Sequence, residues 1–221
     1  MEEDVRIEAG DALLAGNLAV PEGAEGLVIF AHGSGSSRFS PRNRFVARKL
    51  QEAGLATLLF DLLTPEEEAV DRYTREFRFD IPLLARRMIG ATQWVLRQPR
   101  LASLAIGYFG ASTGAAAALI AAAELPEMVK AVVSRGGRPD LAGDALRRVK
   151  ASCLFIVGER DTVVLELHEQ VLPLIPAEKE LVIVPGASHL FEEPGALEEV
   201  ARLAAAWFVR YLTSSSTSDR S

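Results

Sequence analysis

Two short segments near the start of the chain alternate between apolar and polar residues. Residues 5–9 and 14–20 place apolar side chains at every second position, and a Gly10-Asp11 turn separates them. A period of two is typical of a β-strand with one face toward solvent. The pattern therefore predicts an antiparallel hairpin that opens a sheet.

Six later runs are apolar almost throughout and show no alternation. They cover residues 27–30, 55–60, 103–109, 129–134, 153–157 and 181–184. Continuous apolar runs of this length suit parallel strands that are covered on both faces. Together with the hairpin they predict a mostly parallel sheet of about eight strands.

Stretches with helical spacing lie between these runs. They cover residues 42–53, 81–97, 113–124, 140–150, 165–175 and 195–212. In the last stretch, apolar residues from Val200 to Tyr211 recur at three- and four-residue steps, which indicates a helix face packed on the core. Strands that alternate with helices predict right-handed crossovers and helices on both faces of the sheet. The expected fold class is α/β, open and doubly wound.

The remaining segments bound the domain organisation. A length of 221 residues suits a single domain, which we place at residues 1–212. The Ser-rich segment 213–221 is expected to be a disordered tail. Residues 61–80 are highly charged, carry interspersed aromatic residues and are long for a strand-to-helix connection, so they are expected to form at most a short lid.

Composition excludes several partners and compartments. The formal charge is −6, from 24 basic and 30 acidic residues, and it repels the phosphate backbone of a nucleic acid. The longest apolar run, at 115–123, is too short to span a bilayer, so no membrane association is expected. The start of the chain lacks a signal-peptide pattern, and the single Cys153 is expected to be a small core residue. These features favour a cytoplasmic protein.

The strand at 103–109 leads directly into Gly110-Ala111-Ser112-Thr113-Gly114 and then into an Ala-rich helix. A G-x-S-x-G pattern between a strand and a helix places a serine on a sharp turn, where small neighbours let the two elements approach closely. A plain Gly-rich turn is the alternative. In this context the pattern favours Ser112 as a nucleophile.

A serine nucleophile needs a base that is itself oriented by an acid. Asp161 follows the strand at 153–157, and His189 follows the strand at 181–184, so both are expected at the carboxyl edge of the sheet. Glu159 competes with Asp161 for the acid role. His168 lies inside a predicted helix, where we expect an exposed or capping role.

The strand at 27–30 ends in a loop rich in Gly and Ser, at residues 32–37. Such a loop leaves backbone N–H groups free for an oxyanion, and we assign the donors as the N–H groups of Ser34 and Thr113. His32 is expected to order this loop. The loop lacks the Lys of a P-loop and the spacing of a dinucleotide fingerprint, so a nucleotide site is not expected.

Three arginines follow strands at the same edge and are candidate substrate-binding residues. They are Arg38, Arg135 and Arg138. A guanidinium here would bind a substrate carboxylate. The alternative is that they are solvated surface arginines.

These motifs together resemble the α/β-hydrolase superfamily, and within it the dienelactone hydrolase-like group. The resemblance covers about residues 5–212 and rests on the motifs at 32–35, 110–114, 158–161 and 188–189. It implies Ser112 as nucleophile, His189 as base and Asp161 as the orienting acid. Dienelactone hydrolases carry cysteine where this chain has Ser112, a departure that questions lactone specificity. Residues 32–44 also resemble the hydrolase module that some bacterial proteins join to phosphoribosyltransferase-like domains.

The resemblance implies a serine hydrolase that cleaves carboxylic esters, or related acyl bonds, of small soluble substrates. Neither a metal nor an organic cofactor is expected, and the protein is expected to be a monomer or homodimer that acts on a small-molecule ester or lactone. Two alternatives remain open. One is a binding or sensor protein with little or no catalysis, and the other is acyl transfer to an acceptor other than water.

Overall fold

The computed structural model describes residues 1–214, and these contain one eight-stranded sheet. The strand order is β1-β2-β4-β3-β5-β6-β7-β8. Strand β2 runs antiparallel to both of its neighbours, and the strands from β4 to β8 are parallel to one another. The strands are β1 (Glu2–Ala9), β2 (Ala12–Ala19), β3 (Gly26–Ala31), β4 (Ala56–Phe60), β5 (Ala105–Ala111), β6 (Val129–Arg135), β7 (Ser152–Gly158) and β8 (Lys179–Val184). The predicted hairpin and α/β fold class are confirmed.

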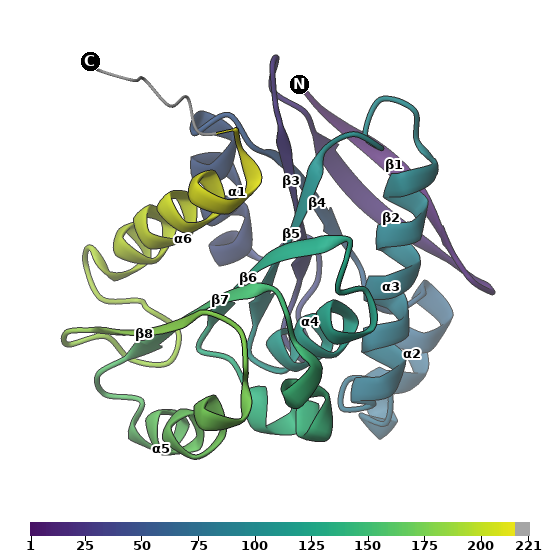
Figure 1. Ribbon diagram of the computed structural model, residues 1–221. Coiled ribbons are helices and arrows are strands. Elements are labelled where there is room, and N and C mark those ends of the chain that lie inside the picture. Colours follow the sequence, from purple (N-terminus) through teal and green to yellow (C-terminus); the bar gives the residue numbers. More distant parts are fainter. Residues whose placement is uncertain (215–221) are drawn as a thin grey trace, which may run out of the picture.

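Helices cover both faces of this sheet. Helices α1 (Pro41–Glu52) and α6 (Ala196–Leu212) lie on one face, and α3 (Ile81–Arg97) and α4 (Thr113–Glu124) lie on the other (Figure 1). The parallel strands are buried on both sides, which explains why their sequences are apolar throughout. Ser112, Asp161 and His189 follow the carboxyl ends of β5, β7 and β8, so the three catalytic candidates lie at one edge of this sheet.

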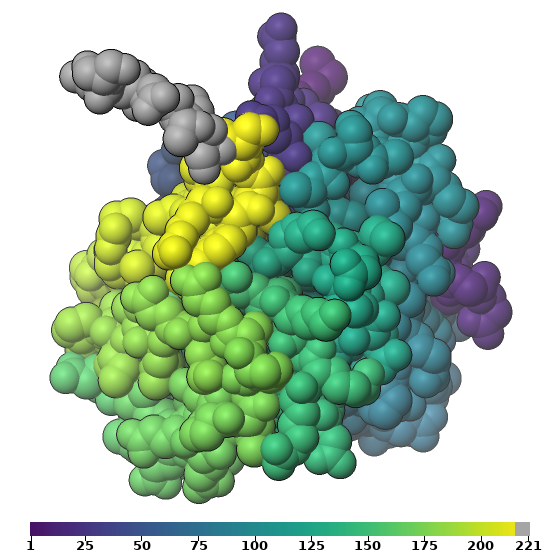
Figure 2. All heavy atoms as spheres, viewed as in Figure 1, coloured from purple at the N-terminus to yellow at the C-terminus, as the bar shows by residue number. Residues whose placement is uncertain are grey.

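The buried side chains form one core on each face of the sheet. The core under α1 and α6 includes Val46 and Phe208, and the core under α3 and α4 includes Met88 and Tyr108. Figure 2 shows the atoms of α6, in yellow, lying against teal and green segments at the surface of the molecule. Gly107 on β5 lets α6 approach closely, since a Cβ there would lie 2.8 Å from Cε1 of Phe208.

Two predicted helices differ in the structure. Residues Pro139–Arg148 form a 3₁₀ segment, η1, in place of the helix expected at 140–150, because Gly143 adopts a left-handed conformation (φ 56°) that interrupts regular helix. The helix expected at 165–175 divides into α5 (Thr162–Val171) and η2 (Leu172–Leu174). Pro173 lacks the N–H that a continuing helix requires.

The long connection at 61–80 contains a helix, α2 (Pro65–Thr74), that the hydrophobic pattern does not predict. Thr64 and Glu67 form a reciprocal capping box at its start, so each side chain bonds the other residue's backbone N–H. Glu67 also forms a bidentate ion pair with the buried Arg87 of α3. Helix α2 is therefore tied to the body of the protein at its first turn.

The prediction that His168 is exposed or caps a helix is wrong. Its side chain is fully buried beneath α5, in edge contact with Phe155, and Nδ1 lies 2.7 Å from the Val164 carbonyl oxygen. Burial lowers the pKa of His168 below the ordinary histidine value, despite opposing effects of that carbonyl and of Asp140 and Asp161. The ring is therefore neutral near pH 7.

Two further observations concern the C-terminus and the membrane. Thr213 and Ser214 bond to the Val209 carbonyl and to Glu25, respectively. The rest of the tail predicted to be disordered, residues 215–221, lies outside the described residues. Among residues 1–214, no helix combines the length and the apolarity needed to cross a bilayer.

Replacement of Phe208 tests the packing of α6 on the sheet. Because its ring is fully buried against β5, Phe208→Ala should lower the free energy of unfolding by about 3–5 kcal/mol. The neighbouring Val209 is 37% exposed, so Val209→Ala should change it by less than about 0.5 kcal/mol. Urea unfolding followed by circular dichroism measures both. Equal losses in the two variants would contradict the described helix face.

Acid sensitivity tests the burial of His168. Its pKa is depressed in the folded state, so the unfolded chain takes up a proton first as pH falls below about 6.5, and stability is lost from there downward. His168→Gln should therefore lose less unfolding free energy than wild type between pH 7 and pH 5, as measured by urea unfolding at both values. An unchanged pH dependence in the variant would contradict a neutral, buried ring.

Candidate active site

Ser112 occupies a strained turn between β5 and α4. Its backbone adopts φ 51° and ψ −124°, a region that L-residues rarely visit. The flanking glycines permit the turn because they let other backbone segments approach closely. A Cβ on Gly110 would lie 2.4 Å from Cα of Ala115, and one on Gly114 would lie 2.3 Å from the Ala31 carbonyl oxygen. The small residues of the G-x-S-x-G pattern are thus sterically required.

The end of β6 holds this turn in place through two backbone hydrogen bonds. The Ser112 N–H donates to the Arg135 carbonyl (3.3 Å), and the Arg138 N–H donates to the Ser112 carbonyl (3.1 Å). Both backbone groups of the strained residue are therefore bonded to one neighbouring loop. This pairing offsets part of the conformational cost at Ser112.

Asp161 and His189 come together at the ends of β7 and β8. Asp161 Oδ2 lies 2.6 Å from His189 Nδ1, a distance typical of a strong, charge-assisted hydrogen bond. Glu159, the competing acid, points elsewhere and accepts the Gly186 N–H at 2.7 Å. The carboxylate beside the imidazole is therefore that of Asp161. The His189 side chain remains 40% exposed, so its ring is open to solvent.

Gly136 connects the imidazole to the strained turn. It follows Arg135, which pairs with Ala111 across the β5–β6 ladder, so Gly136 stands beside Ser112. A Cβ on Gly136 would lie 3.3 Å from both Cε1 and Nδ1 of His189. The imidazole therefore lies near the backbone that neighbours Ser112, at the same edge of the sheet as the other two predicted residues.

The two candidate oxyanion donors are linked by their side chains. The hydroxyls of Ser34 and Thr113 lie 2.7 Å apart, although the residues are 79 positions apart in sequence. Ser34 Oγ donates its hydrogen to the Arg78 carbonyl at 3.3 Å. In the bond between the two hydroxyls, Thr113 is therefore the donor and Ser34 the acceptor. Thr113 begins α4, where N–H groups have no partner within the helix. This link brings the loop after β3 and the start of α4 together.

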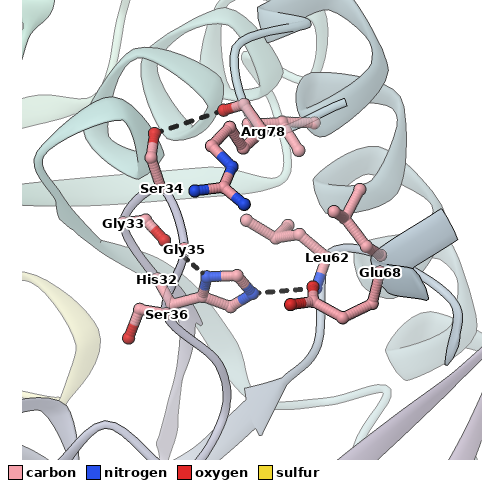
Figure 3. Close-up of a pocket in the computed structure, with 10 residues that line it drawn as sticks. His32, Gly33, Ser34, Gly35, Ser36, Leu62, Glu68 and Arg78 are labelled. Carbon is pink, nitrogen blue, oxygen red and sulfur yellow. Dashed lines mark hydrogen bonds between the residues drawn. The ribbon is translucent and has the colours of Figure 1, made fainter. Parts of the chain in front are cut away.

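His32 orders the loop that carries Ser34. Its Nδ1 lies 2.9 Å from the Gly33 carbonyl, and its Nε2 accepts the Leu62 N–H at 3.1 Å (Figure 3). These partners require a neutral ring with its proton on Nδ1. Burial lowers the pKa of His32, which favours that neutral form. The contacts agree with the structural role that the sequence predicts.

Sequence reasoning missed Arg78, which projects over the same loop. Figure 3 shows its guanidinium pointing toward Gly35 and His32 across a small pocket. Asp71 holds this arginine through its carboxylate and carbonyl, and also accepts the Phe77 N–H. Burial alone would raise the pKa of Asp71, but these hydrogen bonds lower it, so the carboxylate stays charged. The sequence carries no spacing signal that separates Arg78 from its charged neighbours.

The three predicted substrate arginines have different surroundings. Arg38 pairs with Asp61 and also donates to the Asn17 side chain. Arg138 forms a bidentate pair with Asp140, at 2.9 and 2.7 Å. Arg135 is 94% buried and forms no ion pair with any carboxylate among residues 1–214. Of the three, only Arg135 carries a charge that the described protein leaves uncompensated.

Cys153 takes no part in this site. It is fully buried on β7, and burial raises the pKa of its thiol to about 12. The thiol is therefore protonated and unreactive as a nucleophile at neutral pH. The prediction of a core cysteine is confirmed.

Comparison with solved structures supports this arrangement of elements. A dienelactone hydrolase from Anabaena variabilis superimposes with a TM-score of 0.95 at 60% sequence identity, covering 96% of this chain and 99% of that one. Est1E from Butyrivibrio proteoclasticus superimposes with a TM-score of 0.78 at 16% identity, covering 94% and 98% of the two chains. The second likeness is one of fold.

Sequence comparison places the chain in a family. A Mycobacterium tuberculosis protein with the provisional name phosphoribosyl transferase is 60% identical over 211 residues. These residues are 96% of this chain and 47% of the relative, so the chain spans about half the length of the curated relatives it matches. Residues 14–212 match the dienelactone hydrolase family. The chain, with its serine at the strained turn, belongs to the dienelactone hydrolase family.

Proposed function

We propose that this protein is a serine hydrolase that cleaves carboxylic ester, or related acyl, bonds of small organic substrates through an acyl-enzyme on Ser112. One observation carries the proposal. A serine in a strained left-handed turn follows β5, and Gly136, next to this turn across the β5–β6 ladder, lies close to a histidine whose Nδ1 bonds a carboxylate at 2.6 Å. Strained backbone persists only where the surroundings enforce it and is found most often at active sites, so the strain supports a function for Ser112.

In the proposed mechanism His189 acts first as base and then as acid. Nε2 takes the Ser112 hydroxyl proton while Oγ forms a bond to the acyl carbon, and the carbonyl oxygen becomes negative. The same proton passes to the departing alcohol as its bond to carbon breaks. Water then repeats the sequence on the acyl-enzyme and releases the acid. Asp161 keeps the proton of the neutral imidazole on Nδ1, so that Nε2 faces the serine.

The N–H groups of Ser34 and Thr113 would hold the negative oxygen. The hydrogen bond between their side chains joins the two segments that carry these donors before substrate arrives. Preorganised donors of this kind stabilise charge that develops only in the transition state. Ser34 also bonds the Arg78 carbonyl, so the segment after α2 helps to hold the Ser34 loop in place.

The surroundings of the site favour small organic acyl groups. The segments that follow strands at the carboxyl edge each expose one large apolar side chain: Phe39, Phe79, Leu141 in η1, Val163 in α5, and Leu190. The pocket beneath Arg78 encloses only about 10 Å³, too little for an acyl group. We therefore place substrate outside this pocket, on the side where the His189 ring is exposed to solvent, which also suits water as the acyl acceptor.

The provisional transferase name of the longer relatives is compatible with this proposal. The half that they share with this chain is the half that matches the dienelactone hydrolase family. We propose that a phosphoribosyl transfer activity, where one exists in those proteins, belongs to their other half.

Covalent labelling tests the nucleophile. A fluorophosphonate probe should label the wild-type protein at Ser112, as located by peptide mapping, and should not label Ser112→Ala. Turnover of a 4-nitrophenyl ester should fall in that variant by a factor of about 10⁶, the scale for a lost catalytic serine. Absence of labelling in folded wild type would favour the binding-protein alternative.

Two carboxylate variants test the acid. Asp161→Asn should reduce turnover by a factor of about 10⁴, because an amide favours the wrong imidazole tautomer. Glu159→Gln, two residues away, should change turnover by less than about threefold, since the Glu159 side chain bonds the Gly186 N–H and not the imidazole. Steady-state kinetics with one ester compares them. The roles would be reversed if Glu159→Gln were the damaging change.

A further inference from the structure

Arg135 is a buried cation without a counter-ion. Its side chain is 94% buried, and its Nε has no hydrogen-bond partner in the described chain. Among the described residues, its side chain forms one hydrogen bond, a long one from Nη2 to Asn43 Oδ1 at 3.4 Å. Burying an unpaired charge is costly, and proteins normally avoid it through a partner or a bound ion.

The same protein pairs its other inward-facing arginines with carboxylates. Arg87, also buried, bonds both oxygens of Glu67, and Arg78 bonds the buried Asp71. Arg135 has an amide where these residues have an acid. The missing carboxylate is therefore specific to this position.

The surroundings of Arg135 add further positive charge. Arg42 and Asn43 lie in the first turn of α1, where the helix dipole favours an anion, although the Asn43 N–H is already bonded to the Ser40 hydroxyl. Arg42 Nε is also buried without a partner. Burial, and secondarily the nearby Arg42, lower the pKa of Arg135 to about 10, which still leaves the guanidinium charged at neutral pH.

One carboxylate approaches this cluster from outside. Glu192 Oε1 lies 3.9 Å from Arg42 Nη1, and its side chain is 67% exposed. It is too distant for a hydrogen bond, and solvent screens its charge. Glu192 therefore does not neutralise Arg135.

We propose that Arg135, Arg42 and Asn43 form a binding site for a small oxyanion, a phosphate or carboxylate group, beside the catalytic turn. The Arg135 carbonyl accepts the Ser112 N–H, so the residue that carries this guanidinium is hydrogen-bonded to the turn of the proposed nucleophile. The anion is either free or part of the substrate. In the second case the inference rests on the proposed hydrolase function and defines its substrates as anionic esters.

Thermal unfolding in inorganic phosphate tests the site without reference to catalysis. At constant ionic strength, set with sodium chloride, saturating phosphate should raise the Tm of wild type by about 5 °C or more. Arg210→Gln, which removes an exposed arginine on α6, should show the same response. No rise in wild type would overturn the proposal and indicate that water alone solvates Arg135.

Two variants at the site test the proposal through their Tm values, one by adding a carboxylate and one by removing the charge. Asn43→Asp places a carboxylate beside Nη2, so its Tm without phosphate should exceed that of wild type, and phosphate should add little. Arg135→Met removes the buried charge, so phosphate should have no effect on its Tm. If Arg135→Met fails to fold, Asn43→Asp alone decides the matter. A phosphate response in Asn43→Asp equal to that of wild type would contradict the site.

Kinetics distinguish the source of the anion. For an anion carried by the substrate, phosphate should raise the KM of a 4-nitrophenyl hemisuccinate at least tenfold and leave the KM of the neutral butyrate ester unchanged. For a free anion, phosphate should change the KM values of both esters by the same factor. If neither ester is hydrolysed, the proposed function fails, whereas the phosphate-dependent Tm still reports on the anion site.

Discussion

The left-handed backbone of Ser112 is the constraint that links the fold to the proposed chemistry. The turn at φ 51° exists only because β5 and α4 approach through Gly110 and Gly114, and because the end of β6 bonds both backbone groups of Ser112. Such a conformation costs roughly 1–3 kcal/mol and persists only where the surroundings enforce it. The rigid parallel sheet, buried on both faces, supplies that enforcement.

The loops around this turn depend on one another. His32 joins the loop after β3 to the loop after β4, and the hydroxyls of Ser34 and Thr113 join the loop after β3 to α4. The Arg78 carbonyl brings the α2 segment into the same set of bonds. A shift of any one loop would therefore change the spacing of the proposed oxyanion donors.

The sequence predicts the sheet and the catalytic candidates because both depend on local signals. Buried strands are apolar without interruption, and the small residues around Ser112 are required by close packing. The Thr64 and Glu67 capping box was a usable signal for α2, but hydrophobic periodicity does not detect it. His168 was misassigned because a histidine is polar by type, although it shares an inward helix face with Val164, four residues earlier. The pairing state of Arg135 depends on residues 92 positions away, so no local pattern could indicate it.

The central claim is that Ser112 forms a covalent acyl intermediate, and quenched-flow mass spectrometry tests it most directly. Wild-type protein mixed with excess 4-nitrophenyl acetate and quenched in acid within milliseconds should carry one acetyl group, located by peptide mapping on the segment that contains Ser112. Release of 4-nitrophenol should show a burst that matches the acetylated fraction. Steady hydrolysis of the ester with no acyl group on Ser112 at any time would contradict the account.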